Sequence, residues 1–299
     1  MRGTLHLLPS AEFPLWQAAL STRRGFESGA WRKAFGVTGE ELERLVDAVA
    51  EALEDRQLTR GELADEVARL TGSDLLGDRL RESWGALLKP AAALGKLCFA
   101  PSQGQQVRFT RPDTWLGGWT AHDPDEAMAA VTRRFLAASG PVTCEDFARW
   151  WGIPSPARGG RLLERLGSEV ARVEVEGTAA YALAADLPGL AEAGGSRAVR
   201  LLPAFDQYVV TATRQAEHLM PGPFKARVYR PQGWLSPVLL VGGRMDGTWR
   251  QEAKGRRLLV TIEPFTGPRP AWARRAAEAE AERLAAFTGG ELELRWADP

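Results

Sequence analysis

The amino-acid sequence predicts an α+β fold, in which two helical units of one design precede a lobe rich in strands. Three observations lead to this prediction. A helix-start pattern occurs twice, at Thr59 and at Thr143, and each occurrence is followed by a pair of alternating strands. After about residue 196 the pattern changes to apolar strands separated by glycine-containing turns. A chain of 299 residues is long enough for about two or three domains, each with its own core.

The first unit is organised around the stretch QLTRGELADEV. Thr59 and Glu62 have the spacing of a capping box, in which a threonine caps a helix and an acid three residues later reaches back to it. Before this start, residues 40–55 carry apolar side chains at helical spacing and predict an amphipathic helix. After it we expect a third helix at about 80–95. Two short strands around a Gly/Gln tip follow over 97–110.

The second unit repeats this order around the stretch PVTCEDFARWW. Thr143 and Asp146 have the same cap spacing, with the shorter acid in place of glutamate. An amphipathic helix is predicted before this start, over 125–139, and a shorter helix after it, over 157–167. Two alternating strands over 170–184 then form a hairpin.

Helix, helix, helix and hairpin, twice over, is the layout of a winged-helix fold. Its second and third helices form a helix-turn-helix, and the third helix lies in or near a groove of DNA. Winged helices also serve as protein-contact modules and work as monomers and dimers alike, so these alternatives and the oligomeric state stay open. We assign one winged helix to 37–115 and one to 123–187, with 1–36 as the remnant of a preceding unit.

The rest of the chain predicts an α+β lobe over 197–299, after a linker at 188–196. Its first segment, AVRLLPAFDQYVV, predicts a buried strand that runs into a polar turn. A β-meander follows, with a hairpin signal at Asp246-Gly247 and a weaker one at Lys254-Gly255. An Ala-rich helix ending at Gly289 and a final strand close the lobe.

Charge is distributed unevenly, although Lys plus Arg and Asp plus Glu both number 38. Residues 40–82 contain 13 acidic and 6 basic side chains, whereas residues 221–275 contain 11 basic and 3 acidic ones. This asymmetry indicates a localised anionic partner. The alternative is that the basic side chains solvate an exposed sheet face. The cations expected to contact phosphates are Lys89, Lys96, Arg108, Arg158, Arg161, Arg244, Arg250, Lys254, Arg256 and Arg257.

Several classes of protein and site are disfavoured. No stretch approaches about 18 consecutive apolar residues, and residues 2–8 are too short and too polar for a signal peptide, so we expect no membrane partner. The two cysteines lack a CxxC partner and His122 and His218 lack partners at ligand spacing, so we expect no metal. The glycines at 241–244 lie between strands, so no cofactor is expected. We expect a cytoplasmic protein that is associated with the nucleoid when it is bound to DNA.

Three separated motifs, in this order, resemble one known family: RGTLHLL at 2–8, LLPAFDQYVV at 201–210 and GRMDGTWR at 243–250. They are similar to the AlkZ-type DNA glycosylases, helix-turn-helix proteins that remove alkylated bases and in some cases unhook interstrand crosslinks. The resemblance implies tandem winged helices and an α+β C-terminal part around duplex DNA. It also implies a role in DNA repair, double-stranded DNA as partner, alkylated or crosslinked, and no cofactor.

The resemblance leaves enzymatic activity open. In the family, a segment before the RGTxH motif carries a Gln-x-Gln or Gln-x-Asp motif, which positions or activates the attacking water. This sequence contains no such segment, so the chain is expected to be truncated at its N-terminus. Gln103-Gly104-Gln105 is not given the role, because it falls at the expected tip of the first wing. The chain is therefore an active glycosylase, a non-catalytic DNA-binding protein or a protein-interaction module.

Three residues are candidates for a pocket around the damaged nucleotide. Asp206 could stabilise an oxocarbenium-like sugar, His6 could hold a water or a phosphate, and Arg2 could contact a phosphate. Each has a structural alternative: a turn or cap for Asp206, a core position for His6 and a fold-stabilising contact for Arg2.

Overall fold

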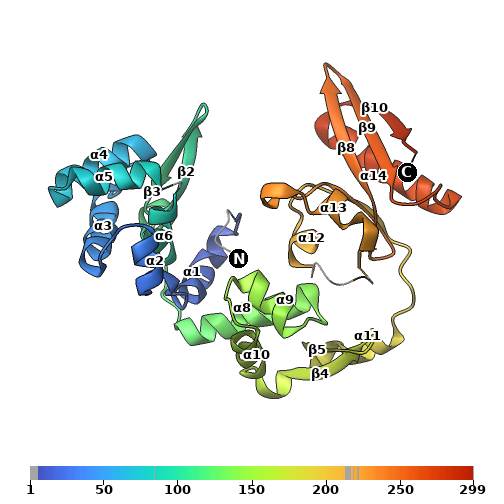
Figure 1. Cartoon of the computed structure of the whole chain (residues 1–299), viewed down its shortest axis with the longest axis horizontal. Helices are drawn as coiled ribbons and strands as arrows, with labels where there is room; N and C mark the ends of the chain where they lie inside the picture. The colour runs from blue at the N-terminus through green and yellow to red at the C-terminus, as the bar shows by residue number, and fades with distance from the viewer. Residues whose placement is uncertain (1–5, 84, 213–216, 218, 221, 299) are drawn as a thin grey trace. The chain divides into compact units, whose positions relative to one another are not determined.

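The computed structural model describes most of the chain (Figure 1); its described residues are 6–83, 85–212, 217, 219–220 and 222–298. It is a mixed α+β protein, as the sequence predicts. Two compact bodies divide the chain, an N-terminal body that extends to Ala138 and a C-terminal body that begins at Ser139. Among the described residues, no helix combines the length and the apolar composition needed to cross a bilayer.

The N-terminal body is mainly helical. Its 3₁₀ helices are η1 (Ser10–Glu12), η2 (Gly25–Glu27) and η3 (Ala86–Leu88). Its α-helices are α1 (Phe13–Ser21), α2 (Gly29–Ala34), α3 (Gly39–Ala52), α4 (Arg60–Thr71), α5 (Asp74–Glu82), α6 (Lys89–Ala93), α7 (Pro112–Leu116) and α8 (Pro124–Ser139). Its strands are β1 (Leu58–Thr59), β2 (Cys98–Gln103) and β3 (Gln106–Thr110), in the sheet order β1-β3-β2.

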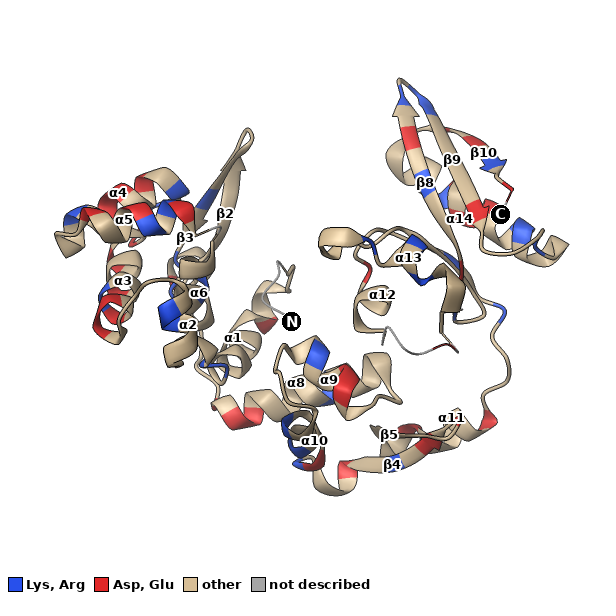
Figure 2. Ribbon diagram, viewed as in Figure 1, with Lys and Arg blue, Asp and Glu red and all other residues tan. Residues whose placement is uncertain are grey.

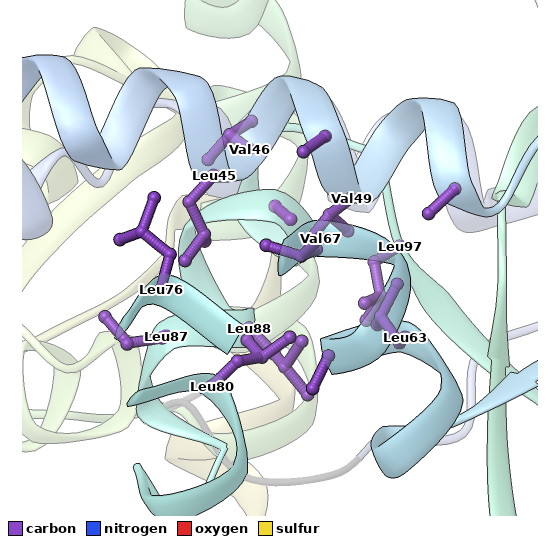
Figure 3. Packing of buried hydrophobic residues seen from close by; sticks show 14 of the residues in the cluster. Leu45, Val46, Val49, Leu63, Val67, Leu76, Leu80, Leu87, Leu88 and Leu97 are labelled. Atoms are coloured by element: carbon purple, nitrogen blue, oxygen red, sulfur yellow. The ribbon is translucent and has the colours of Figure 1, made fainter. Parts of the chain in front are cut away.

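The core of this body is formed where α3, α4 and α5 meet (Figure 3). Leu45 and Val49 on α3 face Leu63 on α4 and Leu76 on α5, and all four side chains are almost completely buried. These apolar positions recur at helical spacing, so burying them fixes which face of each helix turns inward. The expected helix over 40–55 is confirmed as α3.

The expected helix at 80–95 is wrong. Gly72 ends α4 in the left-handed conformation, and Ser73 caps a new helix, α5, so the third helix begins earlier than predicted. Gly85 has a positive φ of 80° and Pro90 lies at the start of α6, which separates α5 from α6. A glycine and a proline thus interrupt what looked like one continuous apolar pattern.

The C-terminal body contains a hairpin and a larger sheet. Its helices are α9 (Cys144–Trp151), α10 (Pro156–Glu164), η4 (Gly167–Glu169), η5 (Ala184–Asp186), α11 (Leu187–Glu192), α12 (Gln207–Thr211), η6 (Gly222–Phe224), α13 (Lys225–Val228), η7 (Pro231–Gly233) and α14 (Ala271–Thr288). Its strands are β4 (Val170–Val175), β5 (Thr178–Leu183), β6 (Val199–Leu202), β7 (Val238–Val241), β8 (Arg244–Lys254), β9 (Arg257–Pro264) and β10 (Glu291–Trp296). The segment 188–196 is partly helical, because α11 occupies its first half.

Five strands form one sheet in the order β10-β9-β8-β7-β6. Helix α14 packs on one face of it through alanines spaced one turn apart, at 273, 277, 281 and 285 (Figure 1). Small side chains let the helix lie close to Val260 and Leu239 of the sheet. Because α14 crosses back over the sheet, β10 pairs parallel to β9, whereas the other neighbours are antiparallel. Gly289 ends α14 in the left-handed conformation, as expected.

The expected turn at Asp246-Gly247 is also wrong. Both residues lie inside β8, at an irregularity where Leu239 pairs with Gly247 and Leu240 pairs with Met245. The turn between β7 and β8 is instead made by Gly242 and Gly243, which both have positive φ. A Cβ on Gly247 would lie 2.6 Å from the carbonyl oxygen of Glu263, so the glycine is needed for strand packing rather than for a turn.

Candidate nucleic-acid interface

Local signals define the ends of α9 and α10. The Thr143 hydroxyl accepts from the Asp146 backbone N–H at 3.1 Å, and the Asp146 carboxylate accepts from the Thr143 N–H at 3.1 Å, which completes the predicted capping box. Gly152 closes α9 in the left-handed conformation. Ser155 caps α10 and Pro156 occupies its first position, where a proline costs no hydrogen bond.

Two glycines let α10 cross α9 closely. A Cβ on Gly159 would lie 2.8 Å from the carbonyl oxygen of Cys144, and a Cβ on Gly160 would lie 2.9 Å from the Cys144 sulfur. Both glycines are buried, whereas Arg158 and Arg161 beside them are exposed. The close crossing therefore buries one face of α10, whereas its basic residues, which are blue on the ribbon in Figure 2, stay exposed.

The outer face of α10 borders a surface depression of about 510 Å³, lined by Arg158, Arg161, Leu162, Glu164 and Arg165. The three arginines are spaced i, i+3 and i+7, so they lie on one side of the helix. Sequence reasoning missed Arg165, although this spacing could have indicated it.

The acid that lines this depression, Glu164, contacts residues of the β4–β5 hairpin instead of the arginines of α10. Glu164 forms an ion pair with Arg172 and accepts a hydrogen bond from the Tyr181 hydroxyl at 3.0 Å. The hydrogen bond from Arg172, followed by that from Tyr181, lowers the pKa of Glu164 below its ordinary value. Among the described residues, Arg158 and Arg161 have no acidic partner within ion-pair distance. The depression thus keeps two cations available for an anionic ligand.

The corresponding helix of the N-terminal body, α5, differs in charge. It crosses α4 at Gly77, where a Cβ would lie 2.8 Å from the carbonyl oxygen of Ala64. Its arginines, however, are engaged by acids of the same body: Arg81 pairs with Asp65 and with Asp78. Arg79 lies 3.7 Å from Glu41. Helix α5 therefore offers few free cations, in contrast to α10.

The cations predicted for the first repeat do not lie on α5. Lys89 begins α6 and Lys96 follows it, and both are exposed. Arg108 in β3 is half-buried and donates a hydrogen bond to the Pro101 carbonyl at 2.9 Å. Gln103-Gly104-Gln105 lies at the exposed tip of the β2–β3 hairpin, as expected. The structure does not bring these cations onto one helix.

The basic hairpin of the lobe is formed by β8 and β9, and all five of its predicted cations are exposed. Three of them have acidic partners: Arg250 pairs with Glu263 and Glu252, Arg256 with Glu291, and Arg257 with Glu293. Arg244 and Lys254 have no acidic partner within the described part of the chain. Because these three arginines are paired with acids, the positive field of the hairpin is weaker than the sequence predicts.

The pocket candidates are placed as follows. Arg2 lies outside the described residues. His6 is exposed, so the core position considered for it is wrong. Asp206 caps α12, since its Oδ1 accepts from the Tyr208 N–H at 2.8 Å, and it therefore fills the structural alternative expected for it. Trp249 is buried and donates to the Leu202 carbonyl at 2.8 Å, so it is a core residue.

Sequence reasoning also missed an aromatic cluster near Asp206. Phe205 and Trp234 are both exposed, and their ring centroids lie 5.0 Å apart. Their positions are 29 residues apart in the chain, and no local pattern links them. The one available signal was the stretch RPQGW at 230–234, which combines turn residues with an arginine and a tryptophan.

These features fit a family of DNA-repair proteins, and the comparison with known proteins identifies it. The chain belongs to the AlkZ-like DNA glycosylase family, whose sequence model matches residues 1–287. The chain is similar to the interstrand DNA cross-link repair glycosylase of Streptomyces sahachiroi, with 34% identity over 293 residues, or 97% of this chain and 78% of that protein. Its structure is similar to that of Streptomyces sahachiroi DNA glycosylase AlkZ, with a TM-score of 0.86 and 33% identity over 99% of this chain and 80% of that one. The resemblance predicted from three motifs is confirmed.

Proposed function

We propose that this chain binds double-stranded DNA through winged-helix units and acts in the repair of damaged bases. Support for the winged helices comes from strand pairing. Leu58, just before the Thr59 cap, pairs with Phe109 on the returning strand of the first hairpin. Val142, just before the Thr143 cap, pairs with Tyr181 on the returning strand of the second. The hairpin would be the wing, and this pairing ties it to the start of the second helix of its repeat.

The observation that carries DNA binding is the outer face of α10. Helix α10 is the third helix of the second repeat. It presents Arg158 and Arg161 without acidic partners among the described residues, and it borders a shallow, open depression. Arginines bind phosphates and displace the counterions condensed on DNA, which gives affinity that falls with salt. Such contacts position a protein on the duplex without reading its sequence.

Binding of a fluorescent duplex across a salt series tests this proposal. For the double variant R158A/R161A we expect weaker binding and a log–log salt slope that is smaller by up to about two units, since each lost phosphate contact removes about 0.9. The matched control is Arg81→Ala on α5, whose arginine is already paired with acids. Unchanged affinity and slope in the double variant would remove α10 from the interface.

Hydrolysis of the glycosidic bond is the activity proposed with this binding. The similar Streptomyces sahachiroi protein is called a glycosylase. Asp206, which we propose as the carboxylate near the sugar, uses Oδ1 to cap α12. Asparagine caps helices as well as aspartate does, so Asp206→Asn removes the charge and keeps the cap. With an alkylated duplex, base release that is lost in this variant while the melting temperature stays unchanged would support the role. Arg2 and His6 remain proposals as residues that contact the damaged nucleotide.

Wild-type protein that binds duplex DNA but releases no base would instead be a non-catalytic binding protein.

Contact with another protein is a second candidate function, and features of the first repeat favour it. There the arginines of α5 are neutralised and the β2–β3 hairpin exposes Phe99 and Val107. Light scattering of the double variant F99S/V107S tests it. A change in mass together with absent duplex binding at low salt would favour the protein-contact module.

A further inference from the structure

The turn between β6 and α12 holds a bulky residue in a strained conformation. Phe205 has a φ of 59°, in the left-handed region that large side chains rarely adopt. The residue is nevertheless 43% exposed, so the strain is not offset by full burial of the side chain. Strain of this kind persists where the surrounding structure enforces it, and it is concentrated at binding sites.

A second exposed ring meets Phe205 from another turn. Tyr229 and Leu235 pair across the loop, and the Arg230 N–H donates to the Trp234 carbonyl at 2.9 Å, so the loop is closed at its base. Trp234 is 58% exposed. The rings of Phe205 and Trp234 are 5.0 Å apart at 82°, an edge-to-face contact that fixes one ring against the other.

Hydrogen bonds tie the turn that carries Phe205 to its neighbours. The Tyr208 hydroxyl donates to the Gly243 carbonyl at 2.6 Å, which joins α12 to the turn between β7 and β8. Asp206 caps the same helix from the position next to Phe205. The two exposed aromatic rings are thus carried by turns that are hydrogen-bonded to neighbouring elements.

The charges nearby select the kind of ligand. Arg230 at the base of the tryptophan loop and Arg244 after Gly243 are both exposed, and neither has an acidic partner among the described residues. An exposed flat ring, with unpaired cations on its own loop and on the strand after Gly243, complements a nucleobase, which has two π-faces and is joined to phosphates. A base inside the duplex hides its faces in the stack, so only an unstacked base can use such a surface.

We propose that Trp234, held in place by Phe205, is a stacking platform for a nucleobase that has left the duplex stack. This inference rests on the proposed DNA binding and adds a recognition element to it. Trp234 contacts the base, and Phe205 acts as a positioning residue behind it. The platform distinguishes unstacked from stacked bases, whereas the arginines of α10 bind both kinds of duplex through phosphates.

The test uses the full chain and three fluorescent probes: a fully paired duplex with 2-aminopurine, the same duplex with 2-aminopurine opposite an abasic site, and the single strand. Wild-type protein is expected to prefer the second probe over the first. Trp234→Ala should reduce affinity for the unstacked base about 5- to 100-fold, the range that base–aromatic stacking contributes, and leave the paired duplex unaffected. Trp234→Phe keeps a ring and should retain most of the affinity.

Phe205→Gly separates positioning from folding. Glycine accepts the positive φ, so the variant should keep the melting temperature of the wild-type protein while it loses part of the preference for the unstacked base. The matched control is Trp115→Ala, which removes a tryptophan of similar exposure (47%) from α7 and should change neither probe.

The outcomes distinguish the two proposals. If Trp234→Ala keeps the preference for the unstacked base, or weakens both duplexes equally, the platform is wrong and duplex binding stands. If wild-type protein binds only the single strand, and does so through Trp234, duplex binding is wrong and the platform stands. Failure to bind any probe overturns both.

Discussion

One guanidinium nitrogen of Arg269 donates to both carboxylate oxygens of Asp246, at 2.8 and 2.9 Å. Both side chains are mostly buried. The other terminal nitrogen of Arg269 donates to the carbonyls of Thr266 and Gly267, at 2.9 and 2.7 Å. The pair therefore fastens the segment after β9 to the irregularity in β8. The aspartate of the GRMDGTWR motif has a structural role that the motif alone does not indicate.

Removing the arginine should destabilise the protein in a pH-dependent way. Burial raises the pKa of Asp246 above its ordinary value, and Arg269 opposes this rise. When folding raises the pKa of an acid, the protein loses stability as the pH rises from the unfolded to the folded pKa of that acid. We expect Arg269→Ala to lower the free energy of unfolding by about 2 kcal/mol near neutral pH and by less in acid, because a protonated Asp246 needs no counter-charge.

Urea unfolding at several pH values measures this effect. The control is Arg275→Ala on α14, an exposed arginine, which should change the free energy of unfolding by less than about 0.5 kcal/mol. Equal destabilisation at every pH would mean that Arg269 acts through the backbone carbonyls alone.

The helix crossings predict a second set of stability effects. At Gly159 a new Cβ would lie 2.8 Å from the Cys144 carbonyl oxygen, and at Gly77 it would lie 2.8 Å from that of Ala64. Because backbone cannot move aside as a flexible side chain does, alanine at either position should cost about 1–3 kcal/mol. Gly61, also helical, has no atom within 4 Å of a new Cβ, so Gly61→Ala should stabilise by about 0.5–1 kcal/mol. Melting temperatures of the three variants compare them directly, and a stable Gly159→Ala variant would contradict the close crossing.

Sequence reasoning succeeded where the determining signal is local. Thr59 and Thr143 cap their helices as predicted, and Gly289 ends α14, because caps depend on residues a few positions apart. The helix at 80–95 failed because the apolar spacing continued across Gly85, where the backbone turns. The turn at Asp246 failed because the need of Gly247 for strand packing outweighed its turn propensity.

The candidate site was less predictable than the fold. The basic residues of α10 follow from their own helix, so they could be named from the sequence. Whether a cation is free depends on acids from other elements, as in the pairing of Arg257 with Glu293 from β10. The contact of Phe205 with Trp234 depends on two separate turns that only the folded chain brings together. Long-range pairing of this kind leaves no periodic trace in the sequence.

The capping box of α4 predicts a specific pKa effect. The Thr59 backbone N–H, and next its hydroxyl, donate to the Glu62 carboxylate and hold the pKa of that carboxyl below its ordinary value. The stabilisation by ionised Glu62 is therefore present above the ordinary glutamate pKa and is lost as the pH falls through the lower, folded value. In Thr59→Ala the hydroxyl is removed and the backbone donor remains, so the pKa of Glu62 should rise only part of the way. An NMR titration of the glutamate carboxyls measures the shift, and an unchanged pKa would exclude the hydroxyl as a cause.

The β8–β9 hairpin allows free and paired cations to be compared on one element. Lys254 and Arg257 are cross-strand partners beside the turn, but Arg257 is paired with Glu293 and Lys254 has no acidic partner among the described residues. If this hairpin contacts DNA, Lys254 can bind a phosphate without breaking an ion pair, and Lys254→Ala removes that contact. We expect it to reduce the salt slope of duplex binding by about one unit, and Arg257→Ala to reduce it by less, because the acid left behind was already compensating that arginine. Glu293→Gln tests the same balance in the opposite direction, since freeing Arg257 should strengthen binding at low salt. If all three variants bind like the wild-type protein, phosphate contact is confined to other parts of the chain, of which α10 is the strongest candidate.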